Sequence, residues 1–264
     1  MLEQVLFVSL FTFIIHLSET LTYSLRVAGV RLGKLAVALS LSGIILLISR
    51  TSNMVQALLT GKIMDSGKHH VDALIDQFHI IIGAATLGTL TALVLFPSAV
   101  LLASRVISHL ETAGSIPVML RSSVSIQKIQ HARYHMRLPK LSMLSRLRTG
   151  GLPKRLLVLN TLVTAIYTIG VLAALLASTL TAESSIAASQ SSGLINGMAT
   201  ILLTLLIDPH IGLITDKVLR GERELHTLNK IFGLLMVSRL CGTMVAQVLL
   251  VPAAYWINWM VSII

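Results

Sequence analysis

The chain has 264 residues, of which 54% are hydrophobic and 12% are charged, and its formal net charge is +10. A soluble domain carries roughly 25% charged residues, so this composition excludes an ordinary soluble protein and indicates an integral membrane protein. Cys241 is the single cysteine, which excludes a disulfide framework and a thiolate metal cluster within one chain.

Six apolar runs are each long enough to cross a bilayer as a helix, which takes about 20 residues. They are too long and too uniformly apolar to be the alternating strands, of about ten residues each, of a membrane barrel. The sequence therefore predicts an all-α, polytopic protein with one integral membrane domain over 1–264. The expected spans are residues 5–25, 35–60, 80–104, 156–181, 193–215 and 231–262.

Basic residues set the expected orientation, because Lys and Arg near helix ends stay on the cytoplasmic side of a membrane. Most of the 21 Lys and Arg residues lie in the connections after the first, third and fifth spans, whereas the other two connections hold only Lys62 and Lys68. We therefore expect both termini to be extracytoplasmic. The same bias accounts for the net positive charge, so nucleic acid is not an expected partner.

The longest connection, residues 105–155, interleaves basic residues with Leu, Ile and Met. This pattern is typical of helices that lie on an anionic membrane surface, where each basic residue contributes about 1 kcal/mol. The sequence therefore predicts a basic, helical connector at the cytoplasmic face that binds anionic membrane lipids.

Two polar segments lie in the connections on the other side. In "DSGKHHVDALIDQFH", helical spacing would put His69, Asp72, Asp76 and His79 on one face, which could hold a divalent ion. An amphipathic helix with a solvated face is the alternative, and we assign no metal here. The second segment, "TAESSIAASQSSG" at residues 181–193, is small and polar, and we expect a short mobile link.

Charged residues also lie inside the predicted spans, where a charge at the bilayer centre costs about 2.5 to 3.5 kcal/mol. Glu19 precedes Arg50 by 31 positions, and Asp208 precedes Arg239 by the same number. The stretch "LLISRTSNMVQALL" around Arg50 is loosely echoed by "LLMVSRLCGTMVAQVLL" around Arg239. This spacing suggests that the first two helices repeat as the last two, in the same orientation.

Two interpretations of these charges stay open. In the first, each arginine neutralises a carboxylate and fixes the register between helices. In the second, Arg50 and Arg239 line a polar cavity and bind an anionic group, because the planar guanidinium matches phosphate with two parallel hydrogen bonds. A diphosphate is the natural ligand for two such arginines, and Asn53 and Gln56 would add uncharged hydrogen-bond donors.

Under the second interpretation, Glu19, His16 and Asp208 have a charge-coupling role. They would keep the empty cavity neutral or titrate during a transport cycle. Pro209 would break the fifth helix just after Asp208 and free backbone groups that the cavity or neighbouring helices must satisfy.

The run "HLSETLTYSLRVAGVRLGKLAVALSLSGIILLISRTSNMVQALLTGKIMD", residues 16–65, and the run "LLIDPHIGLITDKVLRGE" resemble the Amj family of bacterial lipid II flippases. The resemblance extends over essentially the whole chain in length, helix number and position of the basic connector. It implies a multi-pass protein of the bacterial cytoplasmic membrane that moves an undecaprenyl-diphosphate-linked peptidoglycan precursor from the inner to the outer leaflet. The intramembrane arginines are compatible with this role because lipid II carries a diphosphate.

Other motifs limit the alternatives. The chain has no GxxxxGK[ST] loop, so ATP does not drive transport in this chain, and we expect no cofactor. It also has no HExxH or GxSxG motif, so we expect no enzymatic activity. A non-transporting scaffold of cell-wall assembly stays open as an alternative, as does, with less support, an intramembrane hydrolase.

Small residues in the third span could allow close helix packing: Gly83, Ala84, Ala85 and Gly88. They would serve either a homodimer, which would enlarge the wall around a large head group, or contacts within one chain.

Overall fold

The computed structural model describes residues 2–67, 70–115, 117–118, 152–180 and 183–263, and no strand occurs among them. Six helical spans long and apolar enough to cross a membrane confirm the predicted fold class. They are α1 (Leu2–Arg31), α2 (Leu35–Gly67), α3 (Val71–Ala113), α7 (Lys154–Leu180), α8 (Ser185–Leu202) with a π-helical segment (Leu203–Ile207) and α9 (Asp208–Leu219), and α10 (Leu225–Ile263).

The helices extend beyond the predicted apolar runs because polar residues continue the same helical backbone outside the apolar part. The expected link at 181–193 is largely helical, since α8 begins at Ser185. Pro209 does not break the fifth span as predicted. The π-helical segment Leu203–Ile207 precedes Pro209 and leads directly into α9. This wider turn accommodates the proline, which has no backbone N–H to donate, without ending the span.

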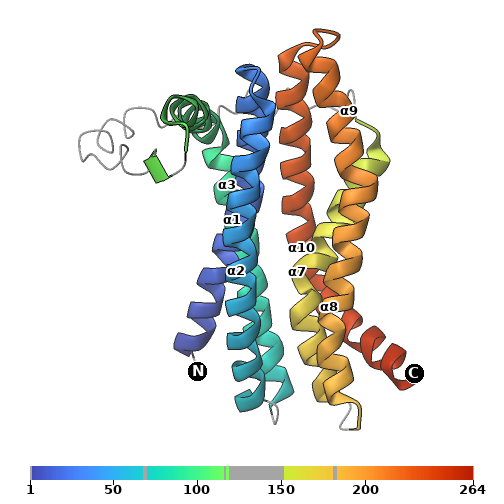
Figure 1. Ribbon diagram of the computed structural model, residues 1–264. Coiled ribbons are helices and arrows are strands. Elements are labelled where there is room, and N and C mark those ends of the chain that lie inside the picture. The colour runs from blue at the N-terminus through green and yellow to red at the C-terminus, as the bar shows by residue number, and fades with distance from the viewer. Residues whose placement is uncertain (1, 68–69, 116, 119–151, 181–182, 264) are drawn as a thin grey trace.

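The helices form two three-helix units with the same packing order (Figure 1). In the N-terminal unit, α1 packs along both α2 and α3, while α2 and α3 meet at few points. In the C-terminal unit, α7 packs along α8 and α10, which also meet at few points. Successive spans run in opposite directions (Figure 1). Because each unit has three spans, the C-terminal unit is inverted relative to the N-terminal unit. This packing does not fit the predicted parallel repeat of the first two helices in the last two.

A glycine stands where the first and third helices of each unit approach closely. A Cβ atom on Gly88 of α3 would lie 2.5 Å from the carbonyl oxygen of Phe13 in α1, and one on Gly242 of α10 would lie 2.6 Å from that of Thr161 in α7. Helices in lipid associate mainly through packing, and small residues let their backbones approach. The equivalent position of the two glycines supports the two-unit description.

The third helix of each unit contains a proline in its second half. Pro97 lies inside α3 and Pro252 inside α10. Figure 1 shows the C-terminal parts of these two helices bending away from the bundle at opposite ends. Proline removes one backbone hydrogen bond and crowds the preceding turn, which is the usual cause of such a bend.

The units meet at the seam, by which we mean the boundary where α1 and α3 face α7 and α10. The contact between α3 and α10 is the most extensive across it. One apolar cluster crosses the seam towards the end that holds the termini and includes Phe78 and Leu250. A second crosses it towards the other end and includes Val27 and Phe232. The middle of the seam, between these clusters, is polar.

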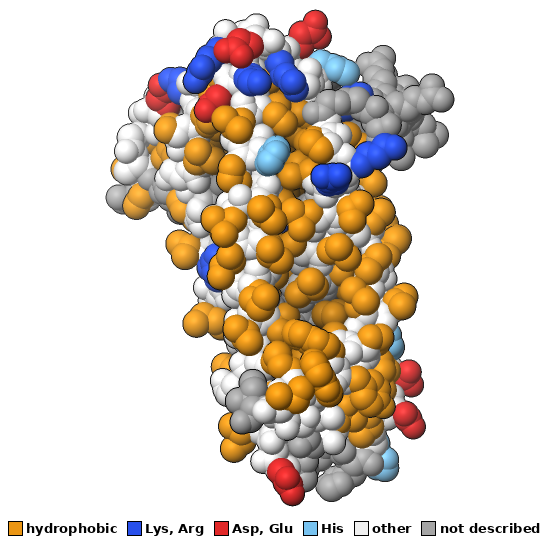
Figure 2. Space-filling view, turned by 90° about the vertical axis from the view of Figure 1, so that its right-hand side faces the viewer, with side chains coloured by type: hydrophobic (Ala, Val, Ile, Leu, Met, Phe, Trp, Pro, Cys, Tyr) orange, Lys and Arg blue, Asp and Glu red, His pale blue; other side chains and the backbone are white. Residues whose placement is uncertain are grey.

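Charge is distributed unevenly between the two ends of the molecule. Figure 2 shows most Lys and Arg side chains of this face gathered, together with some Asp, Glu and His, at one end of a broad apolar surface, whereas the other end carries Asp, Glu and His. Both termini lie at the end away from the basic turns (Figure 1). Most of the predicted connector at 105–155 lies outside the described residues, so its helical, lipid-binding character stays a prediction.

We expect the substitution Gly242→Ala to destabilise the C-terminal unit by about 1 to 3 kcal/mol, the usual cost of overpacking. The added Cβ would contact the α7 backbone and push α7 and α10 apart. Thermal unfolding of the purified protein in detergent measures this change. Gly43→Ala is the matched control, because a Cβ at Gly43 meets nothing within 4 Å. Equal stability of the two variants would contradict the close approach.

Candidate functional site

A buried ion pair joins the two units at the middle of the seam. Arg239 of α10 donates from Nη2 to Oε2 of Glu19 in α1 over 2.9 Å. The two side chains are only 10% and 12% exposed. Removing either charge alone would leave the other unpaired in a poorly solvated interior.

Two further helices contribute donors to the same carboxylate. Ser49 of α2 donates to Glu19 Oε1 over 2.8 Å, and the Tyr167 hydroxyl of α7 donates to the same oxygen over 3.1 Å. The Glu19 carboxylate therefore accepts hydrogen bonds from α2, α7 and α10. We call Glu19, Arg239, Ser49, Tyr167 and His16 the central polar cluster.

The central polar cluster contains unsatisfied polar atoms. His16 lies one turn before Glu19 and is 3% exposed, and its Nδ1 has no hydrogen-bond partner in the described structure. The Nε of Arg239 is likewise buried without a partner. Buried polar atoms almost always find a protein group, water or ligand. The cluster can therefore accept further hydrogen-bonding groups.

A second ion pair crosses between the units nearer the basic end. Arg26 of α1 lies 3.6 Å from Asp208 at the start of α9, and the side chains are 23% and 39% exposed. Beyond it, Arg31 donates to the Asn229 side chain of α10 over 3.2 Å. Arg26 follows Glu19 by seven positions, so α1 presents both charges on one face.

The pairing differs from the one that the equal spacings suggested. Glu19 pairs with Arg239 rather than Arg50, and Asp208 pairs with Arg26 rather than Arg239. Both observed pairs join the two units, because the charged face of α1 points towards α9 and α10.

Arg50 stays outside both pairs. Its side chain is exposed on α2, directly after Ser49, and none of the ion pairs in the described part of the chain includes it. It is near enough to Tyr167 to interact with it electrostatically. Asn53 is half-buried and Gln56 is buried, about one and two turns further along α2.

The structure thus brings four predicted site residues close to one another: Glu19, Arg239, His16 and Arg50. Asp208 lies apart from them. Sequence reasoning missed Ser49, Tyr167 and Arg26. A hydroxyl-bearing aromatic residue in the middle of an apolar span was a signal for Tyr167, and the seven-residue spacing from Glu19 was one for Arg26.

The predicted metal-binding face gains no support among the described residues. Within that part of the chain, no group of three His, Cys, Asp or Glu side chains is placed to hold a metal ion. His69 lies outside the described residues, and His79 instead contacts Gln247 of α10.

Comparisons with known proteins identify relatives of the whole chain. The model of the family described as "Amj: Alternate to MurJ" matches residues 11–261. A protein of Bacillus subtilis (strain 168) named "Lipid II flippase Amj" is 42% identical over 259 residues, which cover 97% of this chain and 96% of that protein. No solved structure matches.

We expect Glu19→Gln and Arg239→Gln each to lower the stability of the folded bundle by about 3 to 5 kcal/mol, because each leaves one buried charge unpaired. The double variant should be more stable than the less stable single variant. Thermal unfolding in detergent provides the comparison.

The exposed pair Arg220 and Glu222 supplies the matched control, with side chains 72% and 50% exposed. Arg220→Gln should change stability by less than about 1 kcal/mol. Additive effects of the two buried substitutions would show that Glu19 and Arg239 do not interact.

Proposed function

The chain belongs to the Amj family, and from this we propose that it is a lipid II flippase, a multi-pass protein of the bacterial cytoplasmic membrane. It moves the undecaprenyl-diphosphate-linked precursor from the inner to the outer leaflet. Beside the family, the buried cross-unit pair of Glu19 and Arg239 carries this proposal. A polar, incompletely satisfied cluster inside a membrane bundle is the feature that passage of a polar head group requires.

The arginines supply the proposed binding groups for the diphosphate. Arg50 is exposed on α2, directly after a residue of the central polar cluster, and belongs to no ion pair within the described residues. Arg239 lies inside the cluster, and its guanidinium Nε has no hydrogen-bond partner in the described structure. In our proposal a diphosphate meets Arg50 first and then competes with Glu19 for Arg239. Asn53 and Gln56 on α2 supply uncharged hydrogen-bond donors.

Alternating access along the seam is the proposed mechanism. Two units of opposite direction suit a movement in which one rocks against the other around a central site. Polar contacts lie on both sides of the central polar cluster, next to the apolar clusters that also cross the seam. Arg26 and Asp208 lie nearer the basic end, and His79 with Gln247 lies towards the other end. Such contacts can be exchanged for water at modest cost, unlike apolar packing.

Positive-inside orientation places the basic end at the cytoplasm and both termini outside it. This orientation lets the basic connector contact anionic lipids of the inner leaflet.

The homodimer also stays a prediction. Within one chain, Gly88 already serves the contact between α3 and α1.

Charge coupling is a further part of the proposal. Glu19, His16 and Asp208 would respond to a proton gradient or membrane potential, because they are titratable groups in and near the seam. Unchanged transport, per folded molecule, after neutralisation of all three would contradict this role.

Purified protein in liposomes that contain lipid II tests the function directly. We expect lipid II to redistribute between leaflets without any covalent change, because we propose that the protein is not an enzyme. A hydrolase would alter the lipid, and a scaffold would leave both its position and its structure unchanged. Protein-free liposomes supply the background rate.

Arg50→Gln tests the binding site, since this exposed side chain can be replaced without leaving a buried charge unpaired. In cells that depend on this protein, we expect the rate at which lipid II appears at the outer surface to fall about tenfold. This decrease corresponds to the loss of one charge-assisted hydrogen bond. Stability should not change.

Arg220→Gln, at matched membrane abundance, is the control for loss of a positive charge. Arg50→Lys should retain part of the activity because it keeps the charge without the paired donors. Normal lipid II exposure with Arg50→Gln would instead direct the search for the diphosphate site to the basic end.

A further inference from the structure

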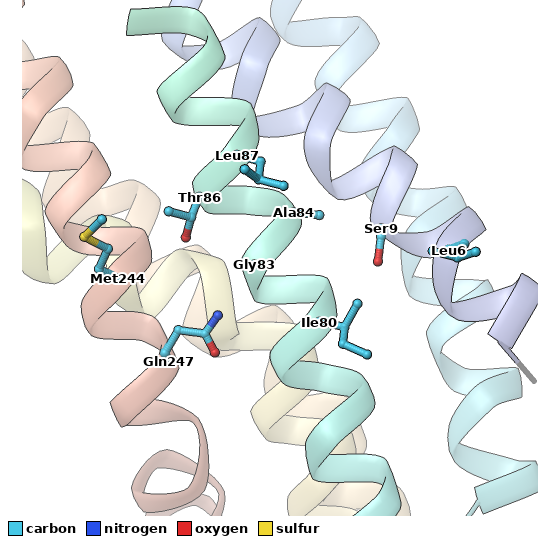
Figure 3. Close-up of a pocket in the computed structure, with 9 residues that line it drawn as sticks. All are labelled: Leu6, Ser9, Ile80, Gly83, Ala84, Thr86, Leu87, Met244 and Gln247. Atoms are coloured by element: carbon cyan, nitrogen blue, oxygen red, sulfur yellow. The ribbon is translucent and has the colours of Figure 1, made fainter.

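A cavity of about 600 Å³ lies across the seam, between α1, α3 and α10 (Figure 3). Its volume is within the range of ligand sites, about 300 to 1,000 Å³. Leu6 of α1, Leu87 of α3 and Met244 of α10 line it and are each more than half exposed at the bundle surface. The cavity therefore opens sideways, towards the apolar surface that lipid covers.

Small residues of α3 create this space. Gly83 and Ala84 form its floor on α3, and Figure 3 shows them between the side chains of α1 and α10. A Cβ on Gly83 would meet only Nε2 of Gln247, at 3.9 Å, which is ordinary contact. Gly83 is thus not required for close helix packing, in contrast to Gly88, and its position leaves the cavity open.

The cavity wall is apolar apart from a few groups. Gln247 donates from Nε2 to the backbone oxygen of His79, and its Oε1 lies 2.6 Å from the ring Nδ1 of the same residue. The Ser9 hydroxyl is buried and has no partner in the described structure. The wall as a whole therefore suits a hydrocarbon chain rather than a sugar or peptide.

The cavity lies on the same helix faces as the central polar cluster. Ser9 precedes His16 by seven positions on α1, and Gln247 follows Arg239 by eight on α10. Residues seven or eight apart share a helix face. At 1.5 Å per residue, these spacings correspond to about 10 to 12 Å along the helices. A molecule with a charged group at the cluster can therefore place an attached chain in the cavity.

We propose that this cavity binds a segment of the polyprenyl chain of lipid II while the diphosphate lies at the central polar cluster. This inference rests on the proposed flippase function. Lipid tails are as apolar as the cavity wall, so the hydrophobic effect gives no preference for one chain over another. Selection comes from the diphosphate, which tethers the chain beside the cavity, and from close contact with the wall.

The occupied cavity also connects substrate to movement. Its wall includes α1 and α3 of one unit and α10 of the other, so any displacement of the units changes its shape. Binding of the chain therefore depends on how the two units are positioned, and the chain is released when the units move apart at the seam.

The test uses the full-length protein in detergent and lipid binding measured by native mass spectrometry. Gly83→Leu places a four-carbon side chain in the middle of the cavity, whereas Gly83→Ala adds one carbon that fits. Gly43→Leu is the matched control for a leucine on an open helix surface. We expect Gly83→Leu to bind lipid II about fivefold more weakly, equivalent to roughly ten lost carbon–carbon contacts. Gly43→Leu should bind like the unmodified protein, and Gly83→Ala should bind lipid II with an affinity between those of the unmodified protein and Gly83→Leu.

A lipid II analogue without the long chain separates the chain site from the head-group site. The unmodified protein and Gly83→Leu should bind this analogue equally. Equal weakening of both ligands in Gly83→Leu would overturn the proposal, because it would show a disturbed head-group site. If Gly83→Leu weakened phosphatidylglycerol binding as much as lipid II binding, the proposal would also be overturned, since the cavity would then bind membrane lipids in general.

The failure of this inference can be told from the failure of the proposed function. If the unmodified protein neither binds lipid II nor moves it in liposomes, the flippase proposal itself is wrong. If it binds and moves lipid II and Gly83→Leu does both equally well, only the chain site is wrong.

Discussion

A carboxylate and a guanidinium that are buried inside a membrane bundle must form an ion pair. The arrangement of the helices in this protein depends on where that pair forms. The charge of Glu19 is on α1 and that of Arg239 is on α10, 220 positions away. Neither can stay unpaired in a medium with few competing polar groups. Their contact fixes the rotation of both helices and brings α2 and α7 close enough to donate to the same carboxylate.

Packing within the units differs in kind from contact between them. Inside each unit, helices approach backbone to backbone at Gly88 or Gly242, where a single added carbon would clash. Between the units, ion pairs and hydrogen bonds interrupt the apolar contact. Under our proposal, closely packed units with a partly polar boundary would suit the kind of arrangement through which transporters change access.

The seam offers two environments to one amphipathic molecule. Its middle is charged and incompletely satisfied, and its apolar cavity lies about two helical turns away on the same faces of α1 and α10. A lipid with a diphosphate and a long chain combines both chemistries. The substrate that we propose for this member of the Amj family therefore matches the physical character of the seam.

The sequence by itself determined the all-α class, the six spans and the concentration of basic residues in alternate connections, because hydropathy and charge are local properties of a chain in a membrane. It also identified the deep charges, including Glu19 and Arg239. Only the tertiary structure decided which charges pair, that Arg50 stays exposed, and that Ser49 and Tyr167 complete the cluster. Pairing depends on which face each helix turns to its neighbours, and equal spacing along the chain carries no information about that rotation.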